Sequence, residues 1–129
     1  MMITQITDGV RISLKTSYLP EHSSPKQSHF VFAYRITIEN CSQNTVQLLR
    51  RHWIISDSNG VIKEVEGEGV VGLQPVLEPG DIHEYSSGCN LKTEIGKMEG
   101  SYLMERIFDG KKMQVSIPEF NLIVPYKLN

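Results

Sequence analysis

Residues 30–39 read FVFAYRITIE, and this stretch decides the fold class. Apolar side chains occupy every second position of it, at Phe30, Phe32, Tyr34, Ile36 and Ile38. The positions between them hold a more mixed and more polar set, namely Val31, Ala33, Arg35, Thr37 and Glu39. A period of two is typical of a β-strand with one buried face, because successive side chains on a strand point to opposite faces. We therefore predict a central strand here.

The same period recurs on both sides of this strand. Val10, Ile12 and Leu14 predict an earlier strand, and residues 19–28, rich in proline and serine, predict a loop. Further strands are expected at residues 46–55, 61–66, 82–86, 101–108 and 113–117, and the first of these is expected to pair antiparallel with the central strand. Because proline cannot donate to a sheet ladder, Pro118 predicts that the strand stops there and that residues 120–124 form an edge strand or an extended tail.

Turn signals separate these segments. Asn59-Gly60 is typical of a tight hairpin turn, and Pro79-Gly80 and Asp109-Gly110 mark later turns. Short strands with frequent turns and no amphipathic helix favour an all-β fold. We predict an antiparallel two-sheet sandwich of seven or eight strands, immunoglobulin-like or fibronectin type III-like, and a single domain over residues 1–129.

Composition excludes several classes of partner. The chain has 129 residues, 13 basic and 15 acidic, with a formal net charge of −2. Such a balance gives no long-range field for nucleic acid or anionic lipid, so we expect no nucleic-acid or membrane partner. The N-terminal residues lack the basic and apolar regions of a signal peptide, and we expect a cytoplasmic protein. Cys41 and Cys89 form no CxxC pattern and are expected to be two reduced thiols.

Residues 67–72, GEGVVG, match the pattern G-x-G-x-x-G through Gly67, Gly69 and Gly72. In dinucleotide-binding enzymes this pattern opens a helix, but Pro75 follows closely here and no helical period begins, so we reject a nicotinamide cofactor and expect no cofactor. A glycine loop can still offer backbone N–H groups to an anion. Phosphate or nucleotide binding by these glycines is therefore one hypothesis, and a plain sandwich loop is the alternative.

Arg51-His52-Trp53 lies within the strand at residues 46–55. Alternation places Arg51 and Trp53 on one face, with Trp53 in the core and Arg51 bonded to a carboxylate or to backbone carbonyls. It places Arg50 and His52 on the other face, where they could dock a protein partner or could simply be solvated.

Catalytic and metal motifs are absent from the sequence. His22, His29, His52 and His83 make none of the HxH, HxxxH or HExxH spacings, so we predict no metal site. Residues 86–89, SSGC, have no neighbouring base, and the alternating Glu64, Glu66 and Glu68 are typical of edge protection, so we predict no enzyme. The apolar residues 70–77 could support self-association or could close one end of the core.

Several segments together resemble the ApaG family: residues 51–60 (RHWIISDSNG), 65–81 (VEGEGVVGLQPVLEPGD), 85–91 (YSSGCNL), 98–104 (MEGSYLM) and 117–122 (IPEFNL). The resemblance implies a fibronectin type III-like sandwich and a bacterial protein linked genetically to cobalt resistance and magnesium efflux, with no established enzymatic activity. Related domains occur in larger eukaryotic F-box and polymerase-interacting proteins, which implies a binding module. The family's G-x-G-x-x-G has also prompted a nucleotide-binding proposal.

Two hypotheses about function follow. The first, which we favour, is a protein-interaction module that uses an exposed strand edge or the face of Arg50 and His52. The second is phosphate or nucleotide binding by the loop at residues 67–72. A homodimer through an exposed edge or through residues 70–77 is compatible with the first hypothesis.

Overall fold

The computed structural model describes residues 2–128, and within them the fold is built from β-strands. The strands are β1 (Ile3–Thr7), β2 (Val10–Tyr18), β3 (Phe30–Asn40), β4 (Val46–Asp57), β5 (Ile62–Glu68), β6 (Val76–Leu77), β7 (Ile82–Leu91), β8 (Ile95–Arg106) and β9 (Lys112–Ile123). Three single 3-10 turns, η1 (Pro20–His22), η2 (Pro25–Gln27) and η3 (Pro125–Leu128), are the helical segments of this part of the chain. None of them is long and apolar enough to cross a membrane.

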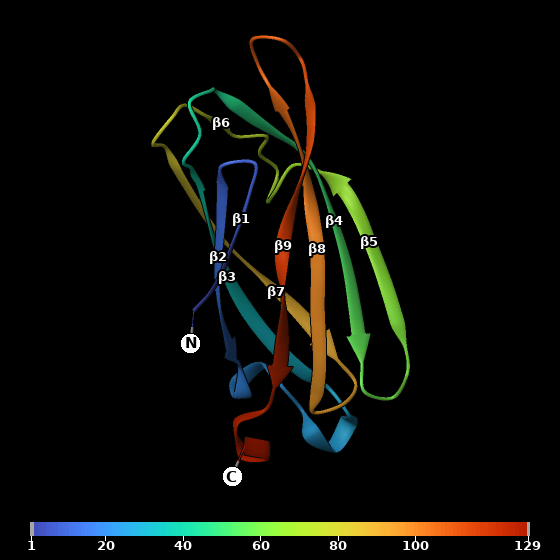
Figure 1. Cartoon of the computed structure of the whole chain (residues 1–129). Helices are drawn as coiled ribbons and strands as arrows, with labels where there is room; N and C mark the ends of the chain where they lie inside the picture. The colour runs from blue at the N-terminus through green and yellow to red at the C-terminus, as the bar shows by residue number, and fades with distance from the viewer. Residues whose placement is uncertain (1, 129) are drawn as a thin grey trace.

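Two antiparallel sheets face each other, which confirms the predicted sandwich (Figure 1). One sheet has the strand order β1-β2-β3-β7, and the other has the order β5-β4-β8-β9, with β6 paired to β4. The predicted central strand is β3, which pairs with β2 on one side and β7 on the other. It does not pair with β4, the partner we predicted, because β4 crosses into the second sheet.

The core fills the gap between the sheets. Alternate residues of β3 point into it, and Phe32, Ile36 and Ile38 are at most 1% exposed. Trp53 of β4 is 3% exposed, and its ring lies 5.4 Å from that of Tyr34 and 6.0 Å from that of Phe120. The prediction that Trp53 anchors the core is therefore confirmed, and aromatic pairs at these separations add to the free energy of burial.

Residues 2–128 form nine strands, one or two more than predicted. The additional ones are β1 and the two-residue β6. The prediction that Pro118 ends a strand is wrong, because β9 runs from Lys112 to Ile123 without a break. Residues 120–123 nevertheless belong to an outer strand, which was one of the two predicted alternatives. The register between β8 and β9 shifts between Met98 and Gly100, and the resulting bulge accommodates the proline.

A second register shift, between Leu48 and Arg50 in β4, sets the orientation of the later residues of that strand. Val46 and Leu48 are buried before it, and Trp53 is buried after it. The extra residue lets both halves of β4 present apolar side chains to the core. Arg51 and Trp53 consequently share the inner face, as alternation predicted.

Candidate functional site

The two long sides of the sandwich differ. On one side β9 packs beside β1 and β2, and the backbone N–H of Ser116 donates to Thr7 Oγ1 over 3.3 Å. On the other side β5 and β7 are the outer strands of their sheets. The inward-facing Val65 of β5 remains 39% exposed, and Lys63 is also exposed. The sandwich is therefore open between β5 and β7.

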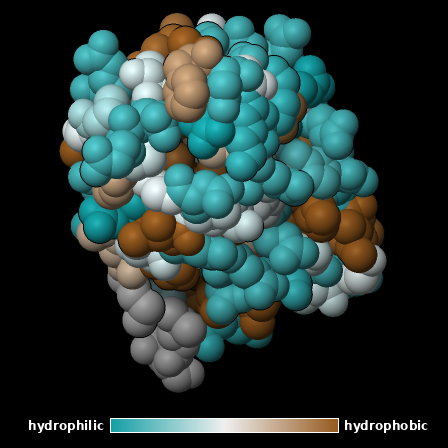
Figure 2. All heavy atoms as spheres, turned by 45° about the horizontal axis from the view of Figure 1, so that its top comes forward, coloured by the Kyte–Doolittle hydropathy of each residue, from teal (hydrophilic) through white to brown (hydrophobic). Residues whose placement is uncertain are grey.

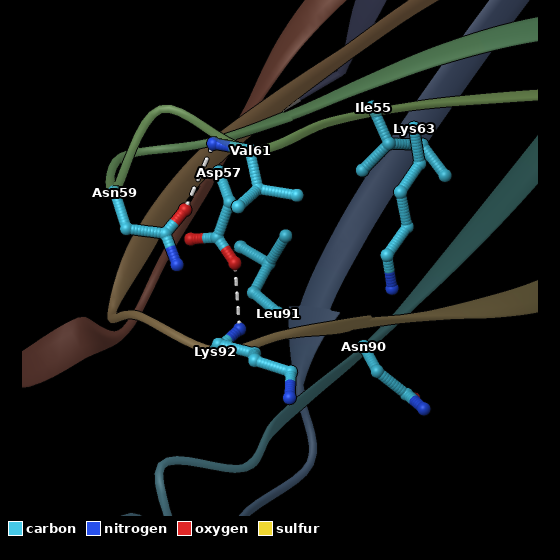
Figure 3. A pocket seen from close by; sticks show the side chains of 8 residues that line it. All are labelled: Ile55, Asp57, Asn59, Val61, Lys63, Asn90, Leu91 and Lys92. Atoms are coloured by element: carbon cyan, nitrogen blue, oxygen red, sulfur yellow. Dashed lines mark hydrogen bonds between the residues drawn. The ribbon is translucent and has the colours of Figure 1, made fainter.

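A cavity of about 230 Å³ lies at this open side (Figure 3). It is lined by Ile55, Asp57, Asn59, Val61, Lys63, Asn90, Leu91 and Lys92. The apolar side chains of Ile55, Val61 and Leu91 face one another, and Lys63 extends from β5 and Lys92 from the turn after β7. The site thus combines an apolar interior with two ammonium groups at its rim.

Asp57 fixes one wall of this cavity. Its Oδ2 accepts a hydrogen bond of 2.7 Å from the backbone N–H of Lys92, and its Oδ1 accepts one from the hydroxyl of Thr93. The N–H of Ser58 donates to the carbonyl of Ile95 over 3.0 Å. The β4–β5 turn is therefore tied to the β7–β8 turn, so the cavity is preformed. Within residues 2–128, neither Lys63 nor Lys92 makes a salt bridge.

The free edge of β7 borders the cavity. The N–H of Asn40 in β3 donates to the carbonyl of Asp81, and the hydrogen-bonded pairs of an antiparallel ladder recur at every second residue. Odd-numbered residues of β7 therefore bond to β3, and the N–H and C=O groups of Ser86, Gly88 and Asn90 point to the free edge. All three are exposed, and residues 85–91 carry no charged side chain.

A partly buried polar cluster lies deeper between the sheets. Arg51 donates through Nη1 to the carbonyls of Glu68 and Gly69 over 2.9 and 3.1 Å, so backbone carbonyls are its partners, one of the two alternatives that the sequence left open. The hydroxyls of Tyr85 and Tyr102 lie 2.5 Å apart. Burial raises the pKa of both phenols well above the ordinary value, so both stay protonated at neutral pH. The two hydroxyls therefore form a neutral hydrogen bond between the facing sheets.

The three motif glycines have structural roles. Gly69 has a φ of 63°, and a Cβ placed on it would lie 2.2 Å from the carbonyl oxygen of Leu73. Gly72 has a φ of 77° and occupies a tight turn closed by reciprocal hydrogen bonds between Val70 and Leu73. A Cβ on Gly67 would lie 2.8 Å from Nη1 of Arg51. Within the described residues, the next element after Gly72 is the strand β6, so no helix opens at this loop, as the absence of a helical period predicted.

Several backbone amides of this loop are already bonded. The N–H of Gly69 donates to the carbonyl of Leu49, and the N–H groups of Val70 and Leu73 donate to each other's carbonyls. An anion site needs several N–H groups that converge on open space. The observed bonding leaves fewer donors for phosphate than the sequence pattern suggested.

Arg50 and His52 lie on the outer face of the second sheet, as alternation predicted. His52 Nε2 lies 2.6 Å from Glu64 Oε1 and 3.6 Å from Glu66 Oε1. These three atoms lie within 4.8 Å of one another, a spacing that could hold a cation, although the side chains already pair among themselves and both carboxylates are exposed. Sequence spacing missed this cluster because it depends on the register of β4 against β5.

Residues 70–77 include both buried and exposed apolar side chains. Val70 and Leu77 are 1% and 4% exposed and close one end of the core. Val71, Leu73 and Val76 are 65%, 56% and 53% exposed. Figure 2 shows that the face drawn there is mostly hydrophilic and that its apolar side chains form separate clusters. That face offers no broad apolar patch.

Comparison with known proteins shows a family. The model of the ApaG domain matches residues 20–106. The chain belongs to the ApaG family. It is 49% identical over 126 residues to Protein ApaG of Paramagnetospirillum magneticum (strain ATCC 700264 / AMB-1), covering 98% of this chain and 96% of that protein. It is 47% identical over 124 residues to Protein ApaG of Brucella abortus (strain S19), covering 96% and 95%.

A solved structure agrees with these matches. The crystal structure of a Bordetella pertussis protein described as ApaA superposes with a TM-score of 0.87 at 44% identity, covering 90% of this chain and 94% of that one. The ApaG resemblance expected from the sequence is confirmed, and so is its sandwich fold. The matched residues 20–106 include every residue that lines the cavity between β5 and β7.

Proposed function

We propose that the chain is a non-enzymatic protein-interaction module that adds an extended segment of a partner protein to the free edge of β7. One observation carries this proposal: the edge groups of Ser86, Gly88 and Asn90 are exposed beside a preformed cavity. In strand addition, backbone hydrogen bonds supply affinity and pockets for alternate side chains supply specificity. Both components lie together at the open side of the sandwich.

Three other outer strands are protected against such pairing, and β6 has only two residues. β5 carries alternating glutamates at Glu64, Glu66 and Glu68. β1 is five residues long, and β9 contains a proline and a bulge and lies beside β1. Charges, prolines, bulges and short length are the usual means by which edges avoid unintended pairing. The ten-residue β7 lacks them from Tyr85 to Leu91, which supports a role in recognition.

The absence of enzymatic activity is part of the proposal. The thiol of Cys89 is a potential nucleophile within β7 itself, but it is buried, and burial raises its pKa to about 11. A thiol with so high a pKa holds little thiolate at neutral pH and is a poor nucleophile. We rank phosphate or nucleotide binding by residues 67–72 second, because several amides of that loop are bonded internally.

The genetic link to cobalt and magnesium that the family resemblance implies is, in this proposal, indirect. The module would act on cation balance through the protein whose segment it binds. The proposal also keeps the expected cytoplasmic location, where such a partner segment would be available.

A proline at the edge tests the proposal. Ser86→Pro removes an edge N–H without removing a hydrogen bond to β3, whereas Ser86→Ala keeps the N–H. Both variants are compared with wild type in affinity capture from a lysate of the native organism, and the captured proteins are quantified by mass spectrometry. We expect a partner that wild type and Ser86→Ala retain and that Ser86→Pro retains at least tenfold less.

The captured partner is then added to the isotopically labelled chain to locate its contact. The expected result is slower hydrogen exchange at the amides of Ser86, Gly88 and Asn90, because these groups would become hydrogen-bonded. Equal capture by Ser86→Pro and wild type would refute strand addition at β7. Saturable nucleotide binding at residues 67–72 without any captured protein would reverse the ranking of the two functions.

A further inference from the structure

We infer that the cavity between β5 and β7 selects partner segments that carry an apolar residue and, two positions away, an acidic residue. The inference rests on the proposed strand addition and names the chemistry of its ligand. The apolar side chain would fill the space between Ile55, Val61 and Leu91, and the carboxylate would lie between the ammonium groups of Lys63 and Lys92 (Figure 3).

The size and lining of the cavity suit a single apolar side chain. Its volume of about 230 Å³ is below the roughly 300–1,000 Å³ of small-molecule sites. Leu91 at its base is 2% exposed, whereas Val61 at its rim is 48% exposed and loses contact with water only if something covers it. Burial of such apolar surface contributes roughly 25 cal/mol per Å². An entering aliphatic or aromatic side chain would supply the missing cover.

The charge at the rim favours a carboxylate. Lys63 comes from β5 and Lys92 from the turn after β7, and neither is paired to an acidic residue within residues 2–128. Asp57 is the acidic residue in the lining, and its two oxygens already accept hydrogen bonds from Lys92 N–H and Thr93. The lining therefore carries two positive charges against one negative charge, and an incoming carboxylate between the two ammonium groups meets net positive charge.

Strand geometry sets the spacing of the two side chains. A segment that pairs antiparallel to β7 begins beside Asn90, at the cavity, and runs toward Ser86. Side chains at positions i and i+2 of a strand share one face and are about 6.6–6.8 Å apart. The two cavity-facing side chains of the segment would therefore be separated by one residue that points away from the cleft. The expected pattern in the partner segment is an apolar residue, then any residue, then an acidic residue.

A random library of displayed twelve-residue peptides tests the inference with the full chain as bait. Bait variants are wild type, Lys63→Glu/Lys92→Glu, and the control Lys15→Glu/Lys111→Glu, which makes the same charge change at exposed lysines of β2 and of the β8–β9 loop. We expect wild type and the control to enrich peptides with the apolar-x-acidic pattern. We expect the cavity variant to lose that enrichment while it keeps the wild-type thermal unfolding midpoint, because both of its lysines are exposed.

The enriched peptide is then synthesised and its binding is measured by calorimetry. Affinity is expected to fall at least tenfold for Lys63→Glu/Lys92→Glu, to be unchanged for the control, and to weaken as salt rises because the contact is partly exposed. A peptide in which lysine replaces the acidic residue is expected to recover binding to the cavity variant. Recovery by charge reversal would exclude a general loss of structure as the cause.

The same peptide separates failure of this inference from failure of the proposed function. Peptides that lose binding to Ser86→Pro but show no acidic preference and bind Lys63→Glu/Lys92→Glu normally would refute the inference and support strand addition. Acidic peptides that need the two lysines but bind Ser86→Pro normally would refute strand addition and keep the cavity as a binding site. A library that enriches no peptide, or only peptides indifferent to all these substitutions, would overturn both.

Discussion

Replacement of Gly69 by alanine is the substitution for which the structure gives the clearest magnitude. The residue has a φ of 63°, and a non-glycine residue in this region costs about 1–2 kcal/mol. The added Cβ would also lie 2.2 Å from the carbonyl oxygen of Leu73, which is backbone and cannot turn aside. The strain of displacing such a packed group is typically about 1–3 kcal/mol. The sum predicts a loss of about 2–5 kcal/mol in the free energy of unfolding.

Gly72→Ala is the matched control for this prediction. Gly72 has a φ of 77°, but nothing lies within 4 Å of the position that a Cβ would take. Only the backbone cost of about 1–2 kcal/mol applies there. The two variants belong to the same motif and differ in the Leu73 contact, so the difference between them measures that contact.

Urea unfolding followed by the fluorescence of Trp53, the sole tryptophan and 3% exposed, measures both variants. With a denaturant slope of about 2 kcal/mol per molar, Gly69→Ala is expected to lower the midpoint by about 1–2.5 M and Gly72→Ala by about 0.5–1 M. Equal midpoints for the two variants would refute the reasoning. The glycines would then need an explanation other than the shape of this loop, and a bound anion would become the leading one.

Two further outcomes follow from titratable groups. Arg106 holds the pKa of Asp109 at about 2, below the ordinary 3.8. The interaction therefore stabilises the fold fully above about pH 4, and this stabilisation is lost as the pH falls toward 2. NMR titration of the Asp109 carboxyl is expected to show the low pKa, and the variant Arg106→Gln is expected to restore an ordinary one. Cys41 is exposed, whereas Cys89 is buried and its pKa is raised from 9.0 to about 11. At neutral pH this shift leaves Cys89 with about a hundredfold less thiolate than a thiol of pKa 9.0 would have. A thiol reagent is therefore expected to label Cys41 rapidly and Cys89 only after unfolding. An ordinary pKa for Asp109, or equal labelling rates for the two native thiols, would contradict the respective outcome.

Hydrophobic alternation was sufficient to predict the architecture because it reports directly which face of each strand is buried. In β3 every second residue is buried without exception from Phe30 to Asn40. The method fails where a strand buries neither face well. β1 has a half-exposed and partly polar sequence, ITQIT, and its place in the sheet comes from pairing with β2 instead of from a buried face of its own.

The local turn geometry was less predictable, and it decides which side chains meet. A two-residue turn at Asn59-Gly60 would pair residue 58 with 61 and place His52 opposite Gly67. In the structure the N–H of Asp57 donates to the carbonyl of Val61, only Gly60 of the turn has a positive φ, and His52 lies opposite Glu66. A difference of one residue in the loop therefore creates the contact of His52 with the glutamates.

The cavity could not be predicted from the sequence for a related reason. Its lining comes from residues 55–63 and 90–92, which belong to opposite sheets and are separated by the glycine loop and most of β7. Alternation shows that Ile55 and Leu91 face inward but does not show that they face each other. Only the strand order places β5 and β7 on the same side of the sandwich.

That strand order also explains why recognition would occur on one side only. A sandwich has four outer strands, and each offers a row of unpaired backbone groups unless something protects it. Here β9 packs against β1 and β2, and β5 carries glutamates on its outer face, so three edges are protected by packing, length or charge. If aggregation were the only pressure on these edges, β7 would also be expected to carry charges or a proline between Tyr85 and Leu91. It carries serines, glycine, cysteine and asparagine there, which leave its backbone accessible to an incoming strand.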